Sequence, residues 1–190
     1  MSIFVAQYRV VVLQNLITSK TRVKLLMKFF MNHRQTSYLR ELESEFGGSS
    51  NAIRLELNRM EGADLLQSHK EGNKKMFQAN REHPLYSDIH NILLKHTGID
   101  LLIESVTRKL GGLHSVYLVG HFARGQDNRV IDLIIAGSDI KLDFLYEMIR
   151  KTENHINRKI RYLHVDNDEI SQTLQSYPEA LLLWENEGRG

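Results

Sequence analysis

The sequence of 190 residues contains no cysteine and only two prolines. Without cysteine the chain can form neither a disulfide framework nor a thiolate metal site. No pair of histidines is spaced four residues apart, so a helical zinc site is not expected either. The apolar run at residues 10–13 is too short to cross a bilayer, and no small-residue cleavage site follows it. We therefore expect one or two small domains in the reducing cytoplasm, with no membrane span, signal peptide or metal.

The net charge of +2 hides an asymmetry between the two halves of the chain. Residues 1–97 hold 14 lysines and arginines against 9 acids, whereas residues 98–190 hold 11 against 14. A basic first half joined to an acidic second half is consistent with a protein whose basic half binds a polyanion. The excess is modest, so charge alone does not identify the partner.

Helical periodicity dominates the first half. Residues 3–17 are apolar and fit either a helix or a strand, and we favour a helix. Three helices are predicted to follow. The first spans residues 20–31 with Ser19 as its N-cap, and the second begins after an N-cap at Thr36 or Ser37 and runs to Phe46. The third spans about residues 50 to 60. Two strands at residues 65–70 and 74–79 are predicted to form a hairpin with a basic tip.

Three helices followed by a basic hairpin are typical of a winged helix-turn-helix. Residues 19–26, 38–42 and 51–60 resemble the bacterial regulators of the ArsR/MarR type. One departure is Asp64, where such proteins usually have glycine before the wing; aspartate tolerates a left-handed backbone better than most residues. The resemblance implies a third helix that reads duplex DNA and a wing that contacts phosphates.

The residues expected to contact DNA are polar or basic and lie on the third helix and the wing. They are Ser50, Asn51, Arg54, Asn58, Arg59, Lys70, Lys74 and Lys75. The alternative is that this face is only solvated, or that the module binds protein, as many modules of three helices and a hairpin do.

The second half is organised around a strand at residues 116–119, the glycine at 120, Ala123-Arg124-Gly125, and a strand at 130–135 that carries Asp132. This pattern resembles the minimal nucleotidyltransferases of the DNA polymerase beta superfamily. In that family the glycine and a helix N-terminus cradle a triphosphate, and two aspartates at i and i+2 on one strand hold two magnesium ions.

Two positions of that pattern differ in this sequence. His121 replaces the serine after the glycine, and Val130 replaces the first aspartate. No acid occurs between residues 154 and 165 to supply a third carboxylate. The resemblance therefore implies a vestigial phosphate site made by Gly120, His121, Arg124 and Asp132, with no catalytic residue, no metal and no cofactor. His121 either contacts a phosphate or only caps the turn.

Asp132 has two interpretations. It is either a buried carboxylate held by hydrogen bonds, with Arg124 as the candidate partner, or part of a residual site for one metal ion.

The expected fold is α+β, with a winged helix-turn-helix at residues 1–82, a helical connector at 83–112 and a small α/β nucleotidyltransferase-like domain at 113–190. The preferred hypothesis is a dimeric, DNA-binding transcriptional regulator that is not an enzyme and whose second domain senses an anionic small molecule or binds a protein. One alternative is a nucleotidyltransferase that acts on a protein or small molecule and is targeted by its winged helix. Another is an antitoxin-like or scaffold protein that uses both domains for protein contacts.

Overall fold

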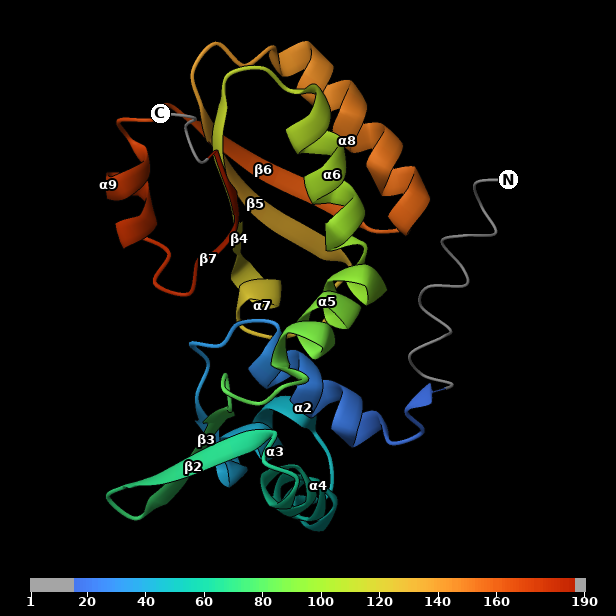
Figure 1. Ribbon diagram of the computed structural model, residues 1–190, viewed down its shortest axis with the longest axis vertical. Helices are drawn as coiled ribbons and strands as arrows, with labels where there is room; N and C mark the ends of the chain where they lie inside the picture. Colours follow the sequence, from blue (N-terminus) through green and yellow to red (C-terminus); the bar gives the residue numbers. More distant parts are fainter. Residues whose placement is uncertain (1–15, 187–190) are drawn as a thin grey trace.

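The computed structural model describes residues 16–186, which form a mixed α+β structure with two separate sheets (Figure 1). In chain order the elements are α2 (Lys20–Phe30), β1 (Ser37–Tyr38), α3 (Leu39–Phe46), α4 (Ser50–Gly62), β2 (Leu66–Glu71), β3 (Lys74–Ala79), α5 (Tyr86–Thr97), α6 (Ile99–Lys109), β4 (Leu113–Val119), α7 (Gly120–Ala123), β5 (Val130–Gly137), α8 (Leu142–Ile156), β6 (Lys159–Val165), α9 (Ile170–Gln175) and β7 (Leu181–Glu185). Nearly all of the helix favoured for residues 3–17 lies outside the described residues.

Three helices and a three-stranded sheet make up the described part of residues 1–82. The Ser19 side chain accepts a hydrogen bond from the backbone N–H of Arg22 at 3.2 Å and so caps α2, as expected. The expected cap at Thr36 or Ser37 is wrong, because Ser37 and Tyr38 pair with β3 as a short strand and α3 begins only at Leu39. The sheet order β1-β3-β2 leaves the β2–β3 hairpin projecting from the helices (Figure 1).

Two local features fix α4 and the turn after it. Glu56 is 5% exposed and accepts a hydrogen bond from Arg22 Nε at 2.8 Å, which ties α4 to α2. Asp64 has a φ of 60°, the left-handed conformation that was expected at this position.

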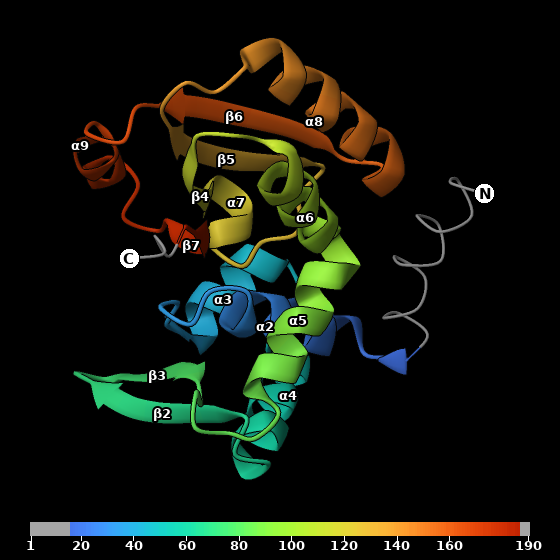
Figure 2. The same ribbon diagram turned by 45° about the horizontal axis from the view of Figure 1, so that its top comes forward.

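The second sheet has the order β6-β5-β4-β7. β5 and β6 are parallel and are joined through α8, because parallel strands need a long crossover. Residues of β5 alternate between the two faces: Ile131, Leu133 and Ile135 pack with α6 and α8, whereas Ile134 and Ala136 pack with residues in and around α9. Figure 2 shows α6 and α8 together on one face of the sheet, with α9 away from them.

The two halves share one buried core, which runs from α2 through α5 and α6 into the second sheet. The Phe30 and Tyr86 rings stack at 5.6 Å, and His90 Nδ1 lies 2.7 Å from the Phe30 carbonyl oxygen. Both ribbon views place α7 where the second sheet meets α2 (Figures 1 and 2). Over the described range 16–186, no helix has the length and apolar character needed to span a bilayer.

Candidate functional site

The site is centred on Gly120, where β4 ends and α7 begins. Because β4 and β5 are antiparallel with Val119 opposite Asp132, the Asp132 carboxylate lies next to the Gly120 backbone. Gly120 has a φ of +68°, and a Cβ built on it would lie 2.9 Å from Asp132 Oδ2. The backbone conformation and the nearby carboxylate both require glycine here.

Asp132 forms an ion pair with Arg161, not with Arg124 as expected. The parallel register of β5 and β6 sets the two residues side by side, and Arg161 Nε donates to Asp132 Oδ1 at 2.6 Å. This hydrogen bond and the negative charge of Asp132 raise the pKa of Arg161. The Asp132 side chain is mostly buried, whereas that of Arg161 is 72% exposed. The guanidinium group is therefore free to offer its other N–H groups to a ligand.

The partner of Arg124 is Glu179, a residue that the sequence pattern did not indicate. Glu179 Oε1 accepts hydrogen bonds from Arg124 Nη2 and from the Gly120 backbone N–H, both at 3.2 Å. Glu179 belongs to the segment between α9 and β7 and is 59 positions from Gly120, so no local spacing links the two. The structure thus adds a second carboxylate to the one at position 132.

A surface cavity of about 400 Å³ brings these groups together. Its walls include Gly120, Arg124, Asp132, Arg161 and Glu179. Of the four residues expected to form a phosphate site, three therefore share this cavity.

His121 is the fourth expected residue, and it lines a different cavity. Its Nδ1 lies 2.9 Å from Gln126 Oε1. The side chain therefore contacts the loop that follows α7.

The carboxylates do not form the two-metal clamp of the nucleotidyltransferase pattern. Val130 supplies no ligand, and one oxygen each of Asp132 and Glu179 already accepts a hydrogen bond from a guanidinium group. Within residues 16–186 no three histidine or acidic side chains gather closely enough to hold a metal ion. Each carboxylate of the site is therefore paired with an arginine, and the arginine N–H groups that these pairs do not use can donate to an anionic ligand.

In the first half, all eight residues expected to contact DNA are exposed. Four of them, Arg54, Asn58, Lys74 and Lys75, line one groove of about 670 Å³ between α3, α4 and the hairpin, and Arg40 lines it as well. The Lys74 ammonium lies 4.3 Å from the centre of the Tyr38 ring.

The other four expected residues, Ser50, Asn51, Arg59 and Lys70, lie outside this groove. Three of the eight residues interact with acids. Lys75 Nζ lies 2.7 Å from Glu61 Oε2, Arg59 Nη1 lies 3.5 Å from Glu56 Oε1, and Ser50 hydrogen-bonds with Glu43. The Lys75 and Ser68 hydrogen bonds lower the pKa of Glu61, so the ion pair removes part of the positive charge from the wing.

No protein-family model matches the sequence, and no curated protein matches it. Among solved structures, a candidate nucleotidyltransferase from Sulfolobus solfataricus is 20% identical, with 48% of this chain and 80% of that chain covered and a TM-score of 0.35. A mutant of the MntA–HpeT toxin–antitoxin is 14% identical, with 46% and 73% covered and a TM-score of 0.38. A toxin–antitoxin with AMP-PNP is 16% identical, with the same coverage and TM-score.

These neighbours are proteins of the minimal nucleotidyltransferase fold, and each match covers less than half of this chain. One expectation from the sequence, that the chain is not an enzyme, is contradicted, because one of the similar structures is a candidate nucleotidyltransferase. They give no support to a winged helix-turn-helix regulator or to DNA binding.

Proposed function

We propose that the Gly120 site binds the phosphates of a nucleoside triphosphate and transfers its nucleotidyl group to a protein or a small molecule in the cytoplasm. The observation that carries this proposal is the joint presence of Arg124, Arg161, Asp132 and Glu179 in one cavity beside Gly120. Each arginine has five N–H donors and uses one of them on its carboxylate. The remaining donors suit the non-bridging oxygens of a triphosphate.

In this proposal the two guanidinium groups stabilise the charge that develops during the transfer. An acceptor hydroxyl oxygen attacks the α-phosphorus, the bond to the β-phosphate oxygen breaks, and pyrophosphate leaves. Asp132 Oδ2 is the oxygen not engaged by Arg161, and it takes the proton of the acceptor hydroxyl. Because Glu179 Oε1 occupies the Gly120 N–H, a phosphate that reaches this N–H displaces the Glu179 carboxylate.

Nucleotides labelled at the α-phosphate test the proposal directly. The chain is incubated with each of the four triphosphates, with magnesium and with EDTA, together with cell lysate and candidate small acceptors. We expect covalent label on an acceptor and release of pyrophosphate, both lost in Asp132→Asn and kept in the exposed-surface control Lys151→Ala. If no triphosphate gives label or pyrophosphate under any condition, the proposed activity is refuted.

We propose as a second candidate function that residues 1–82 form a winged helix-turn-helix that binds duplex DNA, either to regulate transcription or to target the enzyme. The supporting observation is the groove in which Arg54 and Asn58 of α4 face Lys74 and Lys75 of the hairpin. The proposed division of the chain continues with a helical connector at residues 83–112 and a nucleotidyltransferase-like domain at residues 113–190. The groove is lined by Arg40, Arg54, Lys74 and Lys75 and, among the residues that the structure describes, by no acidic residue, and this favours a polyanion over a neutral protein surface.

Anisotropy titrations with labelled duplexes at two salt concentrations test this second function. Arg54→Ala is expected to cost about 1–3 kcal/mol and to relax sequence preference, whereas Lys74→Ala weakens all sequences alike. Binding that neither substitution changes would remove α4 and the hairpin as the contact surface.

The DNA-binding form is proposed to be a homodimer that reads two half-sites. Leu85 and Ile92, at the start of α5 and within it, are about half exposed and supply apolar surface for pairing. Light scattering should give twice the chain mass; a monomer that still protects a single half-site would refute the dimer.

A further inference from the structure

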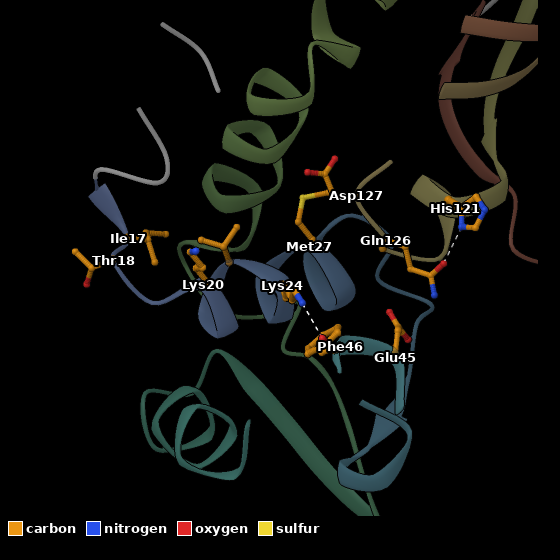
Figure 3. A pocket seen from close by; sticks show the side chains of 12 residues that line it. Ile17, Thr18, Lys20, Lys24, Met27, Glu45, Phe46, His121, Gln126 and Asp127 are labelled. Atoms are coloured by element: carbon orange, nitrogen blue, oxygen red, sulfur yellow. Dashed lines mark hydrogen bonds between the residues drawn. The ribbon is translucent and has the colours of Figure 1, made fainter. Parts of the chain in front are cut away.

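A second, larger cavity lies between the first half of the chain and the loop that leads from α7 to β5 (Figure 3). Its volume is about 730 Å³, within the range of about 300–1,000 Å³ that small-molecule sites occupy. Gly120 and Arg124 line the Gly120 site, whereas His121 and Gly125 line this cavity, so the two are distinct. Small-molecule sites occur preferentially at interfaces of this kind, where two packed units meet.

The charged groups on the wall leave an excess of positive charge. Lys20 and Lys24 of α2 are both exposed, and within residues 16–186 the Lys20 ammonium has no carboxylate partner. Lys24 Nζ donates one hydrogen bond to the Phe46 carbonyl oxygen at 2.9 Å and retains its other N–H groups. The two acids on the wall are already neutralised, Glu45 by Lys28 at 2.6 Å and Asp127 by Arg158 at 2.8 Å. An anionic group is therefore attracted to the two lysines, and both carboxylates on the wall have a cationic partner of their own.

The rest of the wall is partly polar, through Thr18, His121 and Gln126, and partly apolar. Val23 and Met27 of α2 and Phe46 at the end of α3 line it, and Figure 3 shows Phe46 beside Lys24. Apolar surface next to two lysines that have no carboxylate partner within residues 16–186 suits a molecule with an apolar body and one acidic group.

We propose that this cavity binds a small organic anion with an apolar body, such as a medium-chain or aromatic acid. The acidic group contacts Lys20 and Lys24, and the body packs against Val23 and Phe46. Residues of both halves form the wall, with α2 on one side and the Gly125–Asp127 loop on the other. A ligand that binds only the folded chain raises its free energy of unfolding by RT ln(1 + L/Kd), where L is the free ligand concentration. The proposal does not depend on the nucleotidyl transfer proposed for the other cavity.

The probe for this site is anilinonaphthalene sulfonate, an aromatic acid whose fluorescence rises in apolar surroundings. Titration of the full chain should give saturable binding of one probe per chain and a higher melting temperature. Decanoate should displace the probe, whereas decanol, which has the same chain length without the charge, should not. Equal displacement by both would overturn the assignment of an anion site.

Two substitutions and a control connect the binding to this cavity. Lys20→Ala should lower the affinity for the probe about fivefold, because the substitution removes one exposed charge contact. Lys151→Ala, which removes an exposed lysine of α8, should leave the affinity unchanged. Gln126→Trp places a large side chain in the cavity and should abolish binding while the chain stays folded by circular dichroism. The proposal is overturned if the full chain shows no saturable binding, or if neither Lys20→Ala nor Gln126→Trp changes the affinity.

Discussion

Asn32, just after α2, donates a hydrogen bond through Nδ2 to the backbone carbonyl oxygen of Glu179 at 2.9 Å. The same amide nitrogen donates to the carbonyl oxygen of Ala123, also at 2.9 Å. Ala123 precedes Arg124 in the chain, so one buried amide holds the backbone at both members of the Arg124–Glu179 ion pair. The first half of the chain thereby positions two residues of the Gly120 site.

Asn32→Asp should destabilise the folded chain by about 3 kcal/mol or more. The substitution keeps the shape of the side chain but removes both N–H donors and places a carboxylate against two carbonyl oxygens in a buried position. Urea denaturation gives the free energy of unfolding, with Asn58→Asp on the exposed face of α4 as the matched control. A loss below about 1 kcal/mol would show that the amide does not hold the two halves together.

Gly125→Ala should cost about 2 kcal/mol more than Gly72→Ala. Both glycines have positive φ, 73° and 58°, so both substitutions carry the strain of a left-handed residue. Only at Gly125 would the added Cβ meet backbone atoms, with the Lys28 Cα at 2.4 Å and the Met27 carbonyl oxygen at 2.6 Å. Thermal or urea denaturation of the two variants compares them directly. If both variants lose the same free energy of unfolding, α2 and this loop move apart to accept the Cβ at no energetic cost.

Arg161→Gln should weaken nucleoside triphosphate binding by about tenfold and leave the melting temperature nearly unchanged. The guanidinium is mostly exposed, so its ion pair with Asp132 adds little to stability, whereas a phosphate ligand uses its free donors. Calorimetric titration with and without magnesium measures the affinity, and Arg150→Gln on the exposed face of α8 is the control. Unchanged affinity in Arg161→Gln would remove Arg161 from the proposed phosphate site.

Glu56 should make the stability of the protein fall in acid. Burial acts to raise the pKa of Glu56, but hydrogen bonds from Arg22 and Ser19 and the charges of Arg22 and Arg59 outweigh it, so the pKa is lowered. A carboxylate whose pKa is lowered by folding contributes stability that is complete above its unfolded pKa of about 4.5 and is lost as the pH falls through the folded pKa.

The measurement is the free energy of unfolding between pH 3 and pH 6, the range that spans the titration of a glutamate with a lowered pKa. Glu56→Gln should reduce the slope of the free energy of unfolding against pH in this range, whereas Glu147→Gln on the exposed face of α8 should not. The same slope in Glu56→Gln and the unsubstituted chain would exclude Glu56 as the source of the acid sensitivity.

Local periodicity and turn chemistry determine much of this protein. The helical stripes predict α2 and α4, the alternation and glycine turn predict the β2–β3 hairpin, and Asp64 adopts the left-handed backbone that its residue type allows. The signature from β4 through Gly120 to Asp132 likewise follows from residues that are close in the chain. These features were predictable because neighbours within a few residues set them.

The composition of the Gly120 site was decided only by tertiary structure. Arg161 reaches Asp132 because β6 pairs with β5 in a parallel register, and Glu179 reaches Gly120 after the chain has passed through α8, β6 and α9. His121 is adjacent to Gly120 in the sequence, yet its side chain lines the other cavity. Asn32 meets Glu179 across 147 positions of sequence. Strand register and the packing of distant segments set these contacts, and neither leaves a periodic pattern in the sequence.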